Sequence, residues 1–325
     1  MRRSSFAVIS IFLFGLVGCG APSFLITPVQ NTNRLDEIEV AEGHGWSQPK
    51  IAMIEVEGML MNVRAGGFLQ PTENVVSLFT QQLETAERDP AVKAIVLRVN
   101  SPGGTVTASD TMYEELVRFK KNTHKPVIAS CQEVCASGAY YVSCAADEIV
   151  ANPTSVVGSI GVIFNTFDAS QGFAKLGIYN NAIKSGQFKD MGSPFKAVTP
   201  QEREIMQGMV DNYFTRFKQV VTSNRKNLDP KNLPTATDGR VFSGEQAMAI
   251  GLIDRVGLLQ DALDLAKEKA HAPSAKVVMY KRPYGYNGSI YASTNTPIPQ
   301  ANVLHLDLPN SSLFLERGFY YVWNP

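Results

Sequence analysis

The sequence predicts an α/β fold with a largely parallel sheet and flanking helices. Strand-like segments alternate with helical repeats through the middle of the chain, as at residues 92–99 and 105–122. Alternation of this kind is typical of crossover connections between parallel strands. Residues 92–99 (VKAIVLRV) form an almost continuous apolar run, which is typical of a strand buried on both faces.

The expected elements follow in chain order. Residues 50–58 (KIAMIEVEG) alternate like a strand, and residues 72–89 have helical spacing with Thr72 as the expected cap. Residues 100–104 (NSPGG) read as a tight turn after the 92–99 strand. We expect further helices at 105–122, 136–146, 169–176, 200–226, 243–250 and 258–270, and further strands at 126–131, 148–151 and 178–184.

Residues 1–18 are predicted to be a lipoprotein signal peptide. A short basic start precedes an apolar run at residues 6–17, which is too short to span a bilayer because spanning takes about 20 residues. The run ends in Leu-Val-Gly-Cys19, which resembles the lipobox of bacterial lipoproteins. The resemblance implies that Cys19 is lipidated and anchors the protein in the cell envelope, on the extracytoplasmic face of a bacterial membrane.

The rest of the chain divides into three predicted segments. Residues 19–49 are polar and irregular, as expected of a tether, and residues 50–271 hold the folded domain. Residues 272–325 form a tail rich in Pro, Asn, Ser and Tyr, which we expect to be extended or partly disordered.

Charge and cysteine content exclude several function classes. Basic and acidic residues balance at 30 each without a basic cluster in the body of the chain, so we expect no nucleic-acid partner. The four histidines are scattered and no C-x-x-C pair occurs, so we expect neither a metal site nor a cofactor. Cys131, Cys135 and Cys144 are interpreted as small buried residues, although one disulfide and one free thiol would also be compatible with export.

Two short stretches of the sequence contain residues that an enzyme of acyl transfer would need. Gly103 and Gly104 would let the backbone approach a ligand and offer N–H groups to an oxyanion; the alternative is an ordinary Pro-Gly turn. Ser137 follows a predicted strand and begins a predicted helix among small residues. Such a serine is usually only a helix cap, but here the N–H of Gly138 could also face an oxyanion.

A serine nucleophile needs a base. The sequence has no G-x-S-x-G motif and no histidine near an obvious catalytic loop. A neutral lysine could serve if burial lowered its pKa from about 10.4 by roughly 3 units. Residues 184–190 (KSGQFKD) offer two lysines, and spacing alone does not choose between them.

Five motifs resemble the signal peptide peptidase A family. They are NSPGGTVTASD (100–110), ASGAYY (136–141), ANPTSVVGSIGV (151–162), KSGQFKDMGSPF (184–195) and DGRVFSGEQAMAIGLID (238–254). The resemblance implies a ClpP/crotonase-like fold at residues 50–271 and a serine endopeptidase with an acyl-enzyme intermediate.

The resemblance also implies a role for each matching residue. Ser137 would be the nucleophile and Lys189 the general base, whereas Lys184 would not be catalytic. Ser159 would orient the base, and the N–H groups of Gly104 and Gly138 would form the oxyanion hole. Two departures are Ala139, where the family usually has Gly, and Cys135, which replaces a small aliphatic residue and could make the site redox-sensitive or simply pack.

The resemblance further implies peptide substrates, such as cleaved signal peptides, with small or apolar residues next to the cut. It implies a homo-oligomer in which, in some members, a neighbouring subunit completes the cleft. Three alternatives stay open: an acyl-CoA hydratase or isomerase on the same fold, a non-catalytic peptide-binding lipoprotein, and a quality-control protease of envelope proteins with the same chemistry.

Overall fold

The computed structural model describes residues 35–43, 49–62, 74–282 and 318–323. Cys19, the predicted signal peptide and Thr72 lie outside these residues. Within the described ranges, no helix combines the length and the apolar character needed to cross a bilayer.

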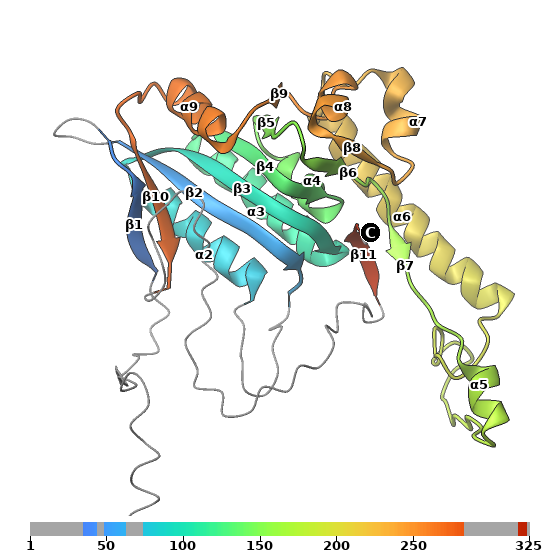
Figure 1. Cartoon of the computed structure of the whole chain (residues 1–325). Helices are drawn as coiled ribbons and strands as arrows, with labels where there is room; N and C mark the ends of the chain where they lie inside the picture. Colours follow the sequence, from blue (N-terminus) through green and yellow to red (C-terminus); the bar gives the residue numbers. More distant parts are fainter. Residues whose placement is uncertain (1–34, 44–48, 63–73, 283–317, 324–325) are drawn as a thin grey trace, which may run out of the picture. The chain divides into compact units, whose positions relative to one another are not determined.

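A single sheet forms the centre of the fold, with the strand order β1-β10-β2-β3-β4-β5-β9 along its main path (Figure 1). All neighbouring pairs from β10 to β9 are parallel, and only β1 runs antiparallel to its neighbour. The prediction of a largely parallel sheet is therefore confirmed. The bounds of these strands are β1 Asp36–Ala41, β10 Lys276–Lys281, β2 Lys50–Leu60, β3 Val92–Thr105, β4 Val127–Ala136, β5 Glu148–Ala151 and β9 Arg255–Val256.

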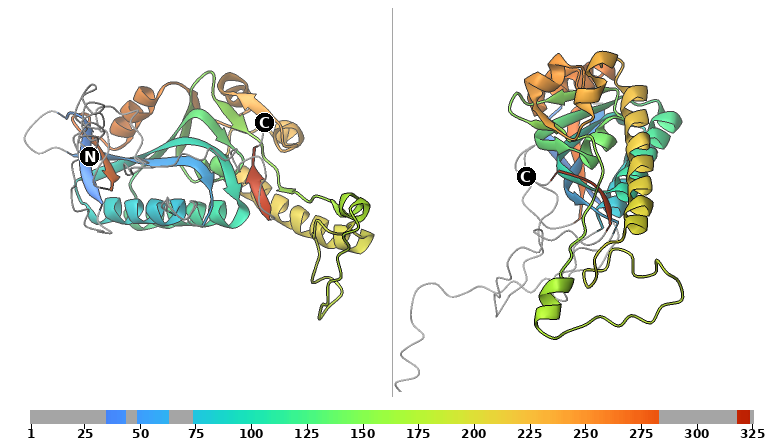
Figure 2. Two further views of the ribbon diagram at one scale, coloured as in Figure 1. Left: turned by 60° about the horizontal axis from the view of Figure 1, so that its bottom comes forward. Right: turned by 90° about the vertical axis from the view of Figure 1, so that its right-hand side faces the viewer.

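Helices cover both faces of the sheet. Helices α2 (Val75–Arg88) and α3 (Val106–Thr123) pack on one face, and α9 (Leu259–Lys269) packs on the other (Figures 1 and 2). Along β3, Ile95 belongs to the core on the α2 and α3 side, whereas Val96 belongs to the core under α9. Burial on both faces explains why residues 92–99 are almost continuously apolar.

The remaining strands pair near the carboxyl ends of the central strands, whereas α5 lies away from the sheet (Figure 1). Strand β6 runs parallel to the end of β4, β8 pairs with β6, and β11 pairs with both β3 and β7. Their bounds are β6 Val156–Gly158, β7 Ile163–Phe164, β8 Val241–Ser243, β11 Phe319–Val322, α4 Gly138–Ser143, α5 Ser170–Lys175, α6 Pro200–Asn224, η2 Pro230–Asn232, α7 Leu233–Ala236 and α8 Gly244–Ala249.

The sheet extends beyond the predicted domain bounds at both ends. Strand β1 lies within the predicted tether, and β10 lies within the predicted tail, where it pairs with β1 on one side and β2 on the other. Residues 276–281 and 319–322 of the predicted tail are extended, but they are strands of the sheet, which the sequence analysis did not predict. Both runs are short and lie between polar segments, so hydrophobic periodicity predicted a strand only weakly at either place. Their pairing with neighbouring strands of the sheet makes them strands.

Two further predictions about local structure are wrong. Residues 100–104 do not turn, because β3 continues through them to Thr105 with a register shift against β2 between Glu57 and Met59. Residues 178–184 form no strand and are exposed, since no neighbouring strand pairs with them. The cap of α2 is Asn74, whose side chain accepts a hydrogen bond from the Ser77 N–H.

The place of β10 in the sheet can be tested with a matched pair of methionines. Met279 on β10 is 1% exposed and Met248 on α8 is 49% exposed. Met279→Ala should lower the free energy of unfolding by about 2–5 kcal/mol because it opens a cavity under α9. Met248→Ala should change it by no more than about 0.5 kcal/mol. Equal effects of the two substitutions in chemical denaturation would contradict this placement.

Candidate active site

Ser137 lies at the junction between β4 and α4 in an unusual backbone conformation. Its φ is 51° and its ψ is −115°, a region that costs a non-glycine residue about 1–3 kcal/mol. The Ser137 N–H donates to the carbonyl of Gly158 at 2.7 Å, which fixes the junction against β6. The side chain makes no capping bond to α4. The structure therefore does not support the reading of Ser137 as an ordinary helix cap.

The hydroxyl of Ser137 is buried without a hydrogen-bond partner. The residue is 1% exposed, and its Oγ has no bonding partner among the described residues. Buried hydroxyls in folded proteins are nearly always satisfied, and exceptions occur at catalytic sites. The unsatisfied Oγ in a strained junction is what a serine nucleophile awaiting a substrate and a base would show.

The predicted oxyanion residues lie together beside this serine. A Cβ placed on Gly138 would lie 3.1 Å from the amide nitrogen of Gly104. A Cβ on Gly104 itself would lie 1.9 Å from the carbonyl oxygen of Leu60. Only glycine permits this approach of backbones, so the structure brings Gly104, Gly138 and Ser137 to one place.

Two further residues border the site: Gly103, which the sequence analysis named, and Ser109, which it did not. Gly103 has φ +100°, and a Cβ on it would lie 2.6 Å from the Gly138 nitrogen. The Oγ of Ser109 would lie 2.3 Å from a Cβ on Gly138, and this hydroxyl donates to the Thr105 carbonyl at 3.0 Å. The Gly-Gly pair pointed to the first residue, whereas no local pattern distinguishes Ser109 from any other helical serine.

Ser159 belongs to the same junction. It directly follows Gly158, the residue that accepts the Ser137 N–H, and it also has a positive φ of 50°. Its N–H donates to the Arg240 carbonyl at 2.8 Å, and the residue is 7% exposed. Its backbone is thus held close to Ser137, and the role of its side chain in orienting a base stays a prediction.

Lys189 is not brought to Ser137. Every residue from 174 to 189 is exposed, in a segment between α5 and α6. The side chain of Lys189 has no bonding partner among the described residues, in contrast to its neighbours. The Nζ of Lys184 lies 2.8 Å and that of Lys196 2.9 Å from Asp190. These two ammonium groups lower the pKa of the Asp190 carboxyl to about 2. Of the two lysines in residues 184–190, Lys184 is therefore held by an ion pair and Lys189 is not.

The cysteines behind the site are packing residues. Cys131, Cys135 and Cys144 are free and buried, and burial raises the pKa of the Cys144 thiol to about 12. The Sγ of Cys135 lies 3.4 Å from the Ser143 Oγ and is fully shielded from solvent, which favours packing over a redox role. The described residues contain no cluster of three potential metal ligands.

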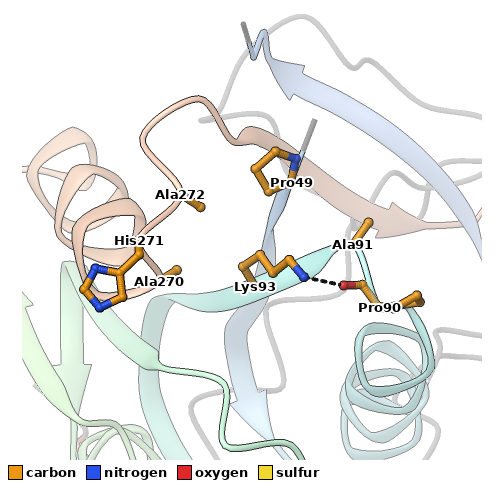
Figure 3. A pocket seen from close by; sticks show the side chains of 7 residues that line it. All are labelled: Pro49, Pro90, Ala91, Lys93, Ala270, His271 and Ala272. Atoms are coloured by element: carbon orange, nitrogen blue, oxygen red, sulfur yellow. Dashed lines mark hydrogen bonds between the residues drawn. The ribbon is translucent and has the colours of Figure 1, made fainter. Parts of the chain in front are cut away.

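A hollow of about 480 Å³ lies at the other end of the sheet (Figure 3). It is bordered by the residues that precede β2 and β3, whereas Ser137 follows the carboxyl end of the parallel strand β4. Its Lys93 ammonium donates to the Pro90 carbonyl at 2.9 Å, and it contains no nucleophile beside a base. Its lining residues are Pro49, Pro90, Ala91, Lys93, Ala270, His271 and Ala272.

The role of the Ser137 hydroxyl can be tested by stability alone. Because Oγ makes no hydrogen bond, Ser137→Ala should leave the free energy of unfolding unchanged or slightly raised. Thr199 is a true cap of α6 with a capping box, so Thr199→Ala should lower this free energy by about 0.5–2 kcal/mol. A loss of that size for Ser137→Ala in chemical denaturation would show that the hydroxyl is structural.

Comparison with known proteins identifies the family. The model of peptidase family S49 matches residues 119–272, and that of Clp protease matches residues 54–157, which confirms the predicted ClpP-like fold. The chain is 34% identical to a candidate signal peptide peptidase SppA of Enterococcus faecium, over 77% of this chain and 72% of that protein.

Two other relatives are longer than the region they share with this chain. A candidate protease of Methanocaldococcus jannaschii is 39% identical over 61% of this chain and 63% of its own length. Protease 4 of Salmonella typhi is 38% identical over 58% of this chain, and this region spans 30% of that protein. The strained serine, the adjacent glycine amides and these matches agree: the chain belongs to the signal peptide peptidase A family of S49 serine peptidases.

Proposed function

We propose that this protein is an endopeptidase that cuts extended peptides with a Ser137/Lys189 dyad. The observation that carries the proposal is the buried, unpartnered Oγ of Ser137 beside the amides of Gly104 and Gly138. A non-catalytic peptide-binding protein would have no reason to keep a strained serine without a hydrogen-bond partner.

The reaction follows from these groups. The neutral Lys189 amine takes the proton of the Ser137 hydroxyl while Oγ bonds to the peptide carbonyl carbon. The N–H groups of Gly104 and Gly138 stabilise the negative charge on the carbonyl oxygen. The C–N bond then breaks, and the lysine proton passes to the leaving amine. The same amine then takes a proton from a water molecule, whose oxygen bonds to the acyl carbon. The bond from this carbon to Oγ breaks, the new carboxyl group is released, and the lysine gives its proton to Ser137.

Lys189 has to come from a second copy of the chain or from a rearranged segment. The segment that carries it is exposed and unusually apolar: Ile183 is fully exposed, Tyr179 is 72% exposed and Phe188 is 38% exposed. Clustered exposed apolar side chains mark interaction sites. We therefore assign residues 174–189 to an interface with a neighbouring copy, in which Lys189 of that copy serves the Ser137 of the first.

A complementation experiment tests both the dyad and its division between copies. Full-length Ser137→Ala and Lys189→Ala should each be inactive on peptides, and Lys184→Ala should keep its activity because that lysine is tied to Asp190. Co-expressed Ser137→Ala and Lys189→Ala chains should recover about a quarter of the normal activity, since half the serines remain and half of these meet an intact lysine in a symmetric ring. No recovery would place the base in the same chain, and an inactive Lys184→Ala beside an active Lys189→Ala would overturn the assignment.

We further propose that the enzyme is anchored in the cell envelope through Cys19 and degrades cleaved signal peptides. The support is the lipobox-like sequence and the similarity to a candidate signal peptide peptidase. A quality-control protease of envelope proteins would use the same chemistry, and cleavage of synthetic signal peptides compared with unfolded polypeptides separates the two.

The anchor has its own test. Cys19→Ser should move the protein from the membrane fraction to the soluble fraction, because two or three acyl chains are lost with the thiol. Labelling with radioactive fatty acid should disappear in the same variant. A Cys19→Ser protein that still pellets with membranes would contradict the anchor.

A further inference from the structure

The pairing of β2 with β3 is irregular just before the glycine pair of the candidate site. The register of the two parallel strands shifts by one residue between Glu57 and Met59 of β2. At this shift Ser101 and Pro102 of β3 stand opposite Gly58 alone, which is the arrangement of a β-bulge. Gly58 has a φ of +65°, and a proline has no N–H to donate. Backbone pairing therefore holds the end of β3 less firmly here than along the preceding strand.

The side chain of Ser101 bridges this bulge. Its hydroxyl donates to the Gly58 carbonyl at 2.6 Å and accepts the N–H of Gly103 at 3.1 Å. Ser101 is fully buried, so water does not compete for either bond. One hydroxyl thus joins β2 to the first glycine of the pair. An alanine could make neither bond, and a thiol could make both only weakly.

The glycine pair needs such a tether if its amides are to act on a substrate. Gly103 has a φ of +100°, and adjacent glycines have the greatest backbone freedom of any residues. Gly104 is anchored on its other side, because a Cβ on it would lie 1.9 Å from the Leu60 carbonyl oxygen. The peptide group that carries the Gly104 N–H therefore lies between two fixed points, and Ser101 supplies the first of them. Donors stabilise a developing charge most when they are fixed before the reaction.

We propose that Ser101 is a positioning residue of the oxyanion hole. Its hydroxyl holds the peptide group between Gly103 and Gly104 so that the Gly104 N–H faces the carbonyl oxygen of the bond to be cut. This inference rests on the proposed function and adds to it a residue that acts only through the backbone, since Ser101 is fully buried. Loss of the hydroxyl displaces the amide and weakens the transition state, whereas the binding of the substrate is kept.

The first test separates kcat from KM in the full-length protein. With a synthetic signal peptide as substrate, Ser101→Ala should lower kcat by about 10- to 100-fold, because a donor is displaced rather than removed. KM should change by no more than about twofold, since ground-state contacts remain. A fall in kcat/KM that comes from KM alone would overturn the proposal.

Ser155→Ala is the matched control. Ser155 is also a fully buried serine, and its hydroxyl donates to the carbonyls of Cys131, at 3.0 Å, and Gln132. These bonds hold the irregular part of β4 and leave the amides of the glycine pair untouched. The control loses a comparable buried hydroxyl, so it should lose stability without the fall in kcat. A kcat for Ser101→Ala no lower than that of Ser155→Ala would overturn the proposal.

A second readout reports on the oxyanion hole itself. In a peptide aldehyde the Oγ of Ser137 adds to the aldehyde carbon, and the oxygen of the adduct lies where the oxyanion would form. The matching peptide alcohol binds without such an adduct. In Ser101→Ala the inhibition constant of the aldehyde should rise by the same factor by which kcat falls, and that of the alcohol should stay unchanged. Equal weakening of both inhibitors would show a merely structural role for Ser101 and overturn the proposal.

The conservative variant Ser101→Thr keeps the hydroxyl and should recover most of the kcat that Ser101→Ala loses. A folded Ser101→Thr protein as slow as Ser101→Ala would overturn the proposal. Thermal unfolding establishes which variants fold. If Ser101→Ala does not fold, Ser101→Cys takes its place, because its thiol fills the same space but bonds weakly. If neither folds, the hydroxyl serves the whole fold and the proposal is overturned.

A fluorophosphonate label on Ser137 of the unmodified protein separates the two levels of failure. Absent labelling together with absent cleavage would overturn the proposed function and this inference with it. Labelling and cleavage by the unmodified protein, with unchanged kcat in Ser101→Ala, would overturn this inference alone.

Discussion

The site depends on the close approach of backbone segments that side chains would keep apart. The end of β3 meets the neighbouring Leu60 carbonyl at Gly104, and it meets the start of α4 where Gly103 lies against Gly138. A Cβ at any of these three glycines would overlap another backbone or a buried hydroxyl. This contact brings the backbone amides of Gly104 and Gly138 close together beside Ser137. If these amides form the oxyanion hole, as we propose, the hole is a property of main-chain packing and exists before any substrate binds.

The surrounding core holds the strained serine in place. The Ser137 N–H is bonded to Gly158, and all six residues of α4 are buried. The Tyr140 hydroxyl donates to the Leu252 carbonyl at 2.6 Å and thereby ties α4 to the segment before β9. A positive φ at a non-glycine residue persists only where many contacts determine it. The density of packing around α4 supplies those contacts and explains why this short helix consists of small and aromatic residues.

The sequence predicted those elements and candidate site residues that a local pattern of neighbouring residues defines. The buried strand at 92–99, the long helix that begins at Pro200 and the motifs that contain Ser137, Gly104 and Gly138 could all be found in this way. The predictions that failed concern segments whose structure depends on strands that are distant in the sequence. Residues 100–104 have the composition of a turn but extend β3, since β2 and β11 pair with them. Strand β11 had a visible signal, the aromatic run FYYVW at residues 319–323, yet its place beside Gly104 follows only from the fold.

The proposed division of the dyad between two copies has a physical consequence. Ser137 and the amides of Gly104 and Gly138 lie together in the described part of one chain, whereas Lys189 is exposed on residues 174–189. If a second copy supplies the amine, dilution separates the proposed nucleophile from its base. Hydrolysis by single chains would then be suppressed, because a serine hydroxyl without a base is a weak nucleophile.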